Sequence, residues 1–181
     1  MNKTEFCEKS GMSEISQMAE MCGQAGKREK KEGRNNMAET EKTGGQNPLE
    51  RIRDIFQNDL FATEAAGIVI EDARPGYSRC TMEIKAHHLN ARGAVMGGAI
   101  FTLADFAGAV AVNCGKEQPD TVALHADITF LSPAKGKQLI AEASSIKDGR
   151  TASLYDIDIR DELGTKVARA SINGFTVGQK K

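Results

Sequence analysis

Asp105 is the residue whose setting most clearly suggests chemistry. Between Ala99 and Val112 the only other residues that are not apolar are Thr102 and Gly108. A carboxylate in apolar surroundings costs several kcal/mol unless it is paired, hydrogen-bonded or exposed in a cavity. Asp105 is therefore either a structural acid bonded to backbone or to a neighbouring chain, or a carboxylate held ready to act as a nucleophile or general base.

Gly97 and Gly98 form a second candidate feature, just before the same apolar run. Between Gly93 and Gly98 there is no Ser, Thr, Asp or Asn that could cap a helix. The first N–H groups of a helix starting here are left for another acceptor, and the helix dipole adds positive charge. A ligand carbonyl or anion could bind there, although close packing of a helix end also explains a Gly-Gly pair.

The run from Ala99 to Val112 predicts the helix that positions both features. It lacks a polar stripe that could face water, so we expect a helix that is buried on all sides. It is shorter than the roughly 20 apolar residues that cross a bilayer, and it contains an acid. We therefore predict the central core helix of a soluble domain.

The flanking sequence predicts the elements around this helix. Asn47-Pro48-Leu49-Glu50 resembles a capping box and begins a short amphipathic helix that ends near Leu60 to Thr63. Alternating strands follow around the turn Arg74-Pro75-Gly76. After the central helix, four alternating runs predict an antiparallel meander. The result is an α+β domain with about six strands in a sheet that curls around the helix.

Residues 1–46 differ in composition from the remainder. They contain no Leu or Val, one Ile, one Phe, and eight Lys or Arg against eight Glu. Such a segment cannot bury enough apolar surface to offset its ordering entropy. We expect a disordered tail over 1–46 and the folded domain over 47–178, with Met37 as a plausible start of a shorter product.

Composition narrows the classes of function. A net charge of −1 gives no case for nucleic acid binding. The four cysteines are widely spaced, without a CxxC pair or a histidine at metal-ligand spacing, so we expect reduced thiols in a cytoplasmic protein without metal or cofactor. No signal peptide or membrane span is predicted.

The residues around the glycine pair resemble the N-x-x-G-x-x-H-G-G…D motif of hotdog-fold acyl-CoA thioesterases of the PaaI-like, phenylacetate-pathway group. The matching positions are Asn90, Gly93, Gly97, Gly98 and Asp105. The resemblance covers roughly residues 48–178. It implies a curled sheet around the long helix, and protomers that pair through sheet edges as a homodimer or homotetramer.

The resemblance also implies roles for individual residues. Gly97 would polarise a thioester carbonyl through its N–H, Asp105 would be the nucleophile or general base, and Asn90 would position the reacting groups. Met96, Gly98, Thr102 and Ala123 would line the substrate site. Two of these depart from the pattern: Met96 replaces the usual His, and Ala123 lacks the hydroxyl that some relatives have. Thr102 could substitute, although a Thr bonded back to its own helix is the simpler expectation.

Helix geometry adds a prediction of its own. Eight residues along a helix span about 12 Å, so Gly97 and Asp105 of one chain cannot both contact one carbonyl group. If both act, they act across a dimer.

Two functions follow as expectations. One is a thioesterase that hydrolyses a small, medium-chain or aromatic acyl-CoA. The other is a non-catalytic hotdog protein that binds acyl-CoA as a sensor or scaffold, which the missing His and hydroxyl would favour.

Overall fold

A computed structural model describes residues 47–116 and 120–177 of the chain. The expectations for residues 1–46, the tail and the alternative start at Met37, lie outside these described residues. The described part of the chain begins with helix α2 (Pro48–Phe56), a short π-helical turn η1 (Phe61–Ala65), strands β1 (Ile68–Arg74) and β2 (Tyr77–Glu83), and a 3-10 turn η2 (Ala86–His88). Helix α3 (Gly97–Asn113) follows, and then strands β3 (Thr121–Phe130), β4 (Gln138–Asp148), β5 (Ala152–Asp161) and β6 (Lys166–Thr176).

Helix α2 starts as its sequence predicts and ends earlier. The side chain of Asn47 accepts a hydrogen bond from Leu49 N, and Pro48 occupies the first helical position. The helix stops at Phe56, several residues before the predicted end, and the chain turns again through η1. Phe56 meets Phe106 of α3 edge to face, with ring centroids 5.4 Å apart, and this contact joins α2 to α3.

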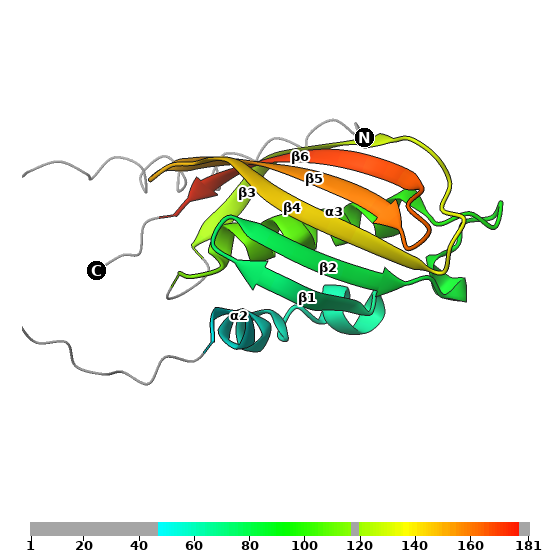
Figure 1. Ribbon diagram of the computed structural model, residues 1–181, viewed down its shortest axis with the longest axis horizontal. Coiled ribbons are helices and arrows are strands. Elements are labelled where there is room, and N and C mark those ends of the chain that lie inside the picture. The colour runs from blue at the N-terminus through cyan, green and yellow to red at the C-terminus, as the bar shows by residue number, and fades with distance from the viewer. Residues whose placement is uncertain (1–46, 117–119, 178–181) are drawn as a thin grey trace, which may run out of the picture. The chain divides into compact units, whose positions relative to one another are not determined.

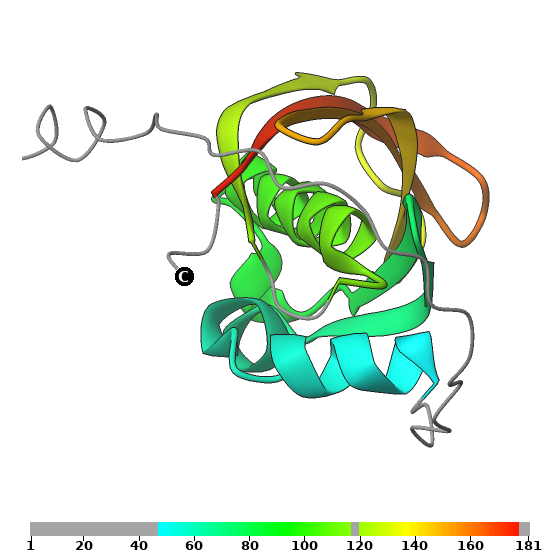
Figure 2. The ribbon, with the colours of Figure 1, turned by 90° about the vertical axis from the view of Figure 1, so that its left-hand side faces the viewer.

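The six strands form one antiparallel sheet in the order β1-β2-β4-β5-β6-β3, and the sheet curls around α3 (Figures 1 and 2). The first hairpin is confirmed, with β1 and β2 joined at Arg74 and Tyr77. The predicted four-strand meander is wrong for its first strand. β3 pairs with β6 at the far edge, whereas β4 pairs with β2 and β5. β3 thus becomes an edge strand ten residues long.

Helix α3 packs into the concave side of this sheet, but it is not buried on all sides as the sequence predicts. Most of its residues belong to the core, with Leu103, Ala107 and Val110 completely covered. Gly98 and Asp105 are exposed, and Thr102 and Ala109, at helical spacing between and beyond them, are half-buried. The helix therefore keeps one open stripe, and Asp105 lies on it.

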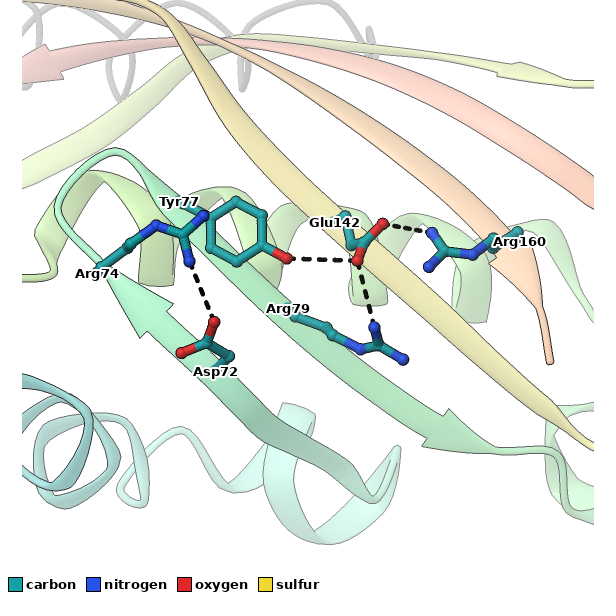
Figure 3. Close-up of polar contacts among 6 residues, drawn as sticks. All are labelled: Asp72, Arg74, Tyr77, Arg79, Glu142 and Arg160. Carbon is teal, nitrogen blue, oxygen red and sulfur yellow. Dashed lines mark hydrogen bonds and ion pairs between the residues drawn. The ribbon is translucent and has the colours of Figure 1, made fainter. Parts of the chain in front are cut away.

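Polar contacts on the outer face of the sheet tie β2, β4 and β5 together (Figure 3). Glu142 alternates along β4 with the core residues Ala141 and Ala143, so it points away from α3. It accepts hydrogen bonds from Tyr77, Arg79 and Arg160. The hydrogen bond from Arg160 is the main reason why the pKa of Glu142 is lowered. This acid is fully partnered and acts as a structural clamp.

None of the helices within 47–116 and 120–177 has the length and apolar character needed to cross a bilayer.

Candidate active site

Asp105 lies in the middle of α3, on the stripe that the sheet leaves open. Its carboxylate has no hydrogen-bond donor or cation within reach among the described residues. The pKa of Asp105 is raised, first because neighbouring groups displace water from the carboxylate and second because the negative charge of Asp59 lies nearby. An unpartnered acid with a raised pKa is the state expected of a reactive group rather than a structural one.

A small cavity of about 40 Å³ adjoins Asp105. Gly108 and Ala109 of α3 form one wall, and Thr121 and Ala123 of β3 form part of the opposite one. A water molecule needs about 10–15 Å³ of such space, so the cavity that Asp105 helps to line has room for at least one. The predicted substrate-site residue Ala123 does lie close to Asp105, and it presents only a methyl group.

Two further residues near Asp105 were not identified from the sequence. Asp59 follows α2, and no local pattern marks its proximity to α3. Ser153 on β5 also lines the cavity, and its hydroxyl has no hydrogen-bond partner. Its polar side chain at an inward position of an alternating strand was a signal that could have been noticed.

The start of α3 has the predicted uncapped geometry. Met96 is the N-cap residue and makes no side-chain cap bond. Its carbonyl accepts from Ala99 and Ile100, but across the described ranges no acceptor lies within reach of the N–H groups of Gly97 and Gly98. Two donors therefore remain at the positive end of the helix dipole.

An open hollow of about 340 Å³ lies against Gly97 and is also lined by Phe130, the last residue of β3, and by Leu131, which follows it. A Cβ atom on Gly97 would lie 2.9 Å from Phe130 Cζ, so close contact with the aromatic ring explains this glycine structurally. The Phe130 side of the hollow is itself half open to solvent, at 53% exposure. The hollow can therefore admit a ligand group to the free N–H.

Asn90 shapes the loop before the helix. Its side-chain oxygen accepts from Arg92 N at 2.9 Å and from Ala94 N at 3.3 Å, and its backbone N–H donates to Ala94 O. Gly93 completes the turn with φ +75°, a left-handed conformation that favours glycine. Asn90 thus holds the loop that leads to Gly97. Its side-chain NH2 group could donate a hydrogen bond to a substrate.

The remaining predicted residues have less to offer. The hydroxyl of Thr102 donates to Gly98 O at 2.9 Å, which is the back-bond to its own helix that we anticipated. Met96 is half exposed beside the glycine pair, and its methyl carbon would lie 2.9 Å from a Cβ on Gly98. Across the described ranges, no group of three His, Cys, Asp or Glu side chains could hold a metal ion.

One protomer does not bring the two halves of the site together. Asp105 opens into the cavity near Ala123, and Gly97 opens into the hollow near Phe130. Eight residues of helix, about 12 Å, separate them. β3 runs back along α3, so the two openings lie beside opposite ends of this edge strand.

Comparison with known proteins places this arrangement in a family. Residues 92–168 match the family described as the thioesterase superfamily. The acyl-coenzyme A thioesterase PaaI of Escherichia coli K12 is 35% identical over 115 residues, which cover 63% of this chain and 80% of the relative.

Solved structures agree with this match. The E. coli PaaI protein from the phenylacetic acid degradation operon superimposes with a TM-score of 0.67 at 28% identity, covering 74% of this chain and 96% of that chain. A hypothetical thioesterase from Streptococcus pneumoniae, solved with coenzyme A, gives a TM-score of 0.59 at 27% identity and covers 70% and 99% of the two chains. The chain therefore belongs to the thioesterase superfamily, in the group of hotdog-fold proteins that includes the PaaI acyl-CoA thioesterase.

Proposed function

We propose that this protein is an acyl-CoA thioesterase that hydrolyses a small, medium-chain or aromatic acyl-CoA to the free acid and coenzyme A. The observation that carries the proposal is the unpartnered carboxylate of Asp105 on the one open stripe of an otherwise buried helix. The names of the E. coli relative and of the pneumococcal structure with coenzyme A support the substrate class.

The chemistry follows from the two ends of the site. The N–H of Gly97 donates to the thioester carbonyl oxygen and stabilises the negative charge that develops there. Asp105 accepts a proton from a water molecule as the water oxygen bonds to the thioester carbon. The carbon–sulfur bond then breaks, the thiolate of coenzyme A takes up the proton, and the free acid is left. A covalent route, in which Asp105 attacks the carbon itself, uses the same carboxylate and forms an anhydride that water then opens.

Both groups can reach one thioester if two chains share the site, with Gly97 from one and Asp105 from the other. β3 is suited to this because it is a long edge strand with large apolar side chains in the open: Val122, Leu124 and Phe130 are 49%, 69% and 53% exposed. Such an edge presents unpaired N–H and C=O groups to a second copy.

The register of this pairing decides whether the site is completed. Antiparallel pairing of two β3 strands about a two-fold axis between Ala126 and Asp127 sets Phe130 opposite Ala123 of the partner subunit. Gly97 lies against Phe130, and Asp105 lies by Ala123. This register therefore turns each Gly97 hollow toward the partner's Asp105, and makes the homodimer a chemical requirement.

The activity is tested with a panel of acetyl-, butyryl-, octanoyl-, palmitoyl- and phenylacetyl-CoA. Release of thiol is followed together with loss of thioester absorbance, because the chain has four cysteines of its own. Hydrolysis of at least one member is expected. Tight binding of these compounds without hydrolysis would instead support the non-catalytic sensor. The absence of an imidazole at Met96 and of a hydroxyl at Ala123 favours that alternative.

The shared site is tested by mixing two inactive variants. Gly97→Pro removes the N–H donor at a helix position that favours proline, and Asp105→Asn removes the base. Hybrid dimers contain one intact site, so random exchange restores about a quarter of wild-type activity. Gly97→Ala is the matched control, because it carries a similar Cβ toward Phe130 but keeps the N–H. A mixture that stays inactive after subunit exchange would contradict the shared site.

A further inference from the structure

Ser153 on β5 has a buried hydroxyl that bonds to nothing in the described protein. The residue is 6% exposed, and its Oγ atom is one of two buried side-chain polar atoms there without a hydrogen-bond partner. A buried hydroxyl without a partner is costly, and native proteins satisfy nearly all such groups with protein or ordered water. Oγ is shielded from bulk solvent, so its partner has to come from the adjoining cavity.

The sheet leaves space between Ser153 and the edge strand. Ser153 pairs with Gly174 on β6, and Gly174 pairs with Ala123 on β3, so the three residues form one row across the concave face. A Cβ on Gly174 would lie 2.6 Å from Ser153 Oγ and 2.7 Å from Thr121 Cγ2. The missing side chain at Gly174 is what leaves room for the hydroxyl.

This row borders the same cavity that Asp105 helps to line. Its volume of about 40 Å³ exceeds the roughly 10–15 Å³ that one water needs, and a stable internal water needs at least two polar partners. Ala123 contributes a methyl group, the hydroxyl of Thr121 is already engaged with Lys116 and Asp120, and that of Tyr155 donates to Asp148 at 3.3 Å. Asp105 and Ser153 are the polar lining side chains for which the described protein supplies no hydrogen-bond partner.

We propose that Ser153 is a positioning residue that holds a water molecule in this cavity beside the carboxylate of Asp105. The inference rests on the proposed function, because the water becomes the nucleophile only if Asp105 acts as its base. The hydroxyl does not itself react: it orients the water, the proton passes to Asp105, and the oxygen bonds to the thioester carbon. The hydroxyl missing at Ala123 is thereby supplied from β5.

The test compares Ser153→Ala with a matched control, Ser78→Ala. Ser78 is also a buried serine on the concave face, but its hydroxyl donates to Ala107 O at 2.6 Å. Ser153→Ala is expected to lower the single-turnover hydrolysis rate about tenfold, with KM and the thermal unfolding midpoint unchanged. Ser78→Ala is expected to lower the midpoint and leave the rate close to wild type.

A conservative variant separates the hydroxyl from the side chain as a whole. Ser153→Thr keeps Oγ and suits a strand, so its rate is expected to stay near wild type. A wild-type rate in Ser153→Ala, or a rate in Ser153→Thr as low as in Ser153→Ala, would overturn the proposal. So would a loss of rate that comes with a loss of stability like that of Ser78→Ala.

A crystal structure provides a readout independent of turnover. An ordered water bonded to Ser153 Oγ and Asp105 is expected in the unliganded wild-type protein, and its loss is expected in Ser153→Ala. If the wild type hydrolyses nothing in the acyl-CoA panel, the proposed function fails, but the presence or absence of this water still tests the inference about Ser153. A wild-type cavity without the water would overturn the inference about Ser153 and leave the proposed function standing.

Discussion

Two aspartates of the domain, Asp105 on α3 and Asp161 on β5, have opposite surroundings. Asp161, at the end of β5, is completely covered, and its carboxylate accepts four backbone N–H bonds. The donors are Lys135 at 2.8 Å, Gly136 at 3.0 Å, Leu163 at 3.1 Å and Thr165 at 2.7 Å. Asp105 is open to solvent on one side and has no such donor in the described part of the chain.

The pKa values of the two acids diverge accordingly. Desolvation acts to raise the pKa of Asp161, but the N–H groups of Lys135, Thr165 and Gly136 outweigh it and hold that pKa at about 2. For Asp105, desolvation meets no such opposition, and the charge of Asp59 raises the pKa further. The comparison shows that hydrogen-bond donors around a carboxylate, and not desolvation alone, decide the direction in which its pKa moves. Desolvation acts to raise the pKa of both acids, and only Asp161 has N–H donors that reverse the effect.

The Asp105→Asn substitution should give the largest effect and is the strongest test of the difference between Asp105 and Asp161. Loss of a general base or nucleophile is expected to reduce hydrolysis by about 10²–10⁴-fold, measured as kcat on the best acyl-CoA of the panel. The thermal midpoint is expected to stay or rise at neutral pH. The raised pKa means that ionisation of Asp105 opposes folding above that pKa, and Asn removes the charge.

Asp158→Asn serves as the control, since Asp158 is an exposed acid on β5 away from the cavity. The Asp158→Asn substitution is expected to change neither kcat nor the thermal unfolding midpoint. Wild-type turnover in Asp105→Asn would show that Asp105 has no part in the mechanism. A large fall in the thermal unfolding midpoint of this variant would show that Asp105 is a structural acid like Asp161.

Asp161→Asn is expected to have the reverse profile at neutral pH. An amide cannot accept all four N–H bonds, so the thermal midpoint should fall by several degrees. The loop from Lys135 to Lys137 should loosen, and hydrolysis should fall only to the extent that folded protein is lost.

The effect of Asp161→Asn depends on pH in a defined direction. A folded-state pKa of about 2, below the ordinary 3.8, means that the carboxylate stabilises the fold above about pH 4. That contribution is lost as the pH falls toward 2. The difference in midpoint between wild type and Asp161→Asn should therefore shrink in acid, and a difference that grows would contradict this account.

The smallest expected effect comes from Asp59→Asn. Removing this charge should lower the pKa of Asp105, so the acid limb of the kcat profile should move to lower pH. The plateau rate near neutral pH should stay unchanged. Glu64→Gln is the control, because Glu64 is an exposed acid in η1. An equal displacement of the acid limb by both variants would mean that net charge, and not the position of Asp59, sets the pKa of Asp105.

Much of the candidate site was predictable because it depends on local sequence. The absence of a capping side chain before Gly97, the turn at Gly93 and the back-bond of Thr102 all involve residues within a few positions of one another. Asp105 stood out because an acid in an apolar run is unusual whatever surrounds it. The catalytic roles of Gly97, Asp105 and Asn90 remain predictions.

Asp59 and Ser153 were not predictable in the same way. Asp59 is 46 positions before Asp105 and Ser153 is 48 positions after it. Their proximity to it depends on how η1 and β5 pack around α3. The error over the meander has the same origin. Alternation marks a strand and its two faces, but it does not specify the neighbour with which that strand pairs.

The sequence by itself determined the central helix, the hairpin before it, the strands after it and the conspicuous acid, since periodicity and capping are properties of neighbouring residues. Only the tertiary structure decided that β3 lies at the free edge of the sheet, that one stripe of α3 stays uncovered, and that Ser153 shares a cavity with Asp105. Those outcomes depend on contacts between residues far apart in the chain, where the packing of the curled sheet, and not local preference, decides which side chains meet.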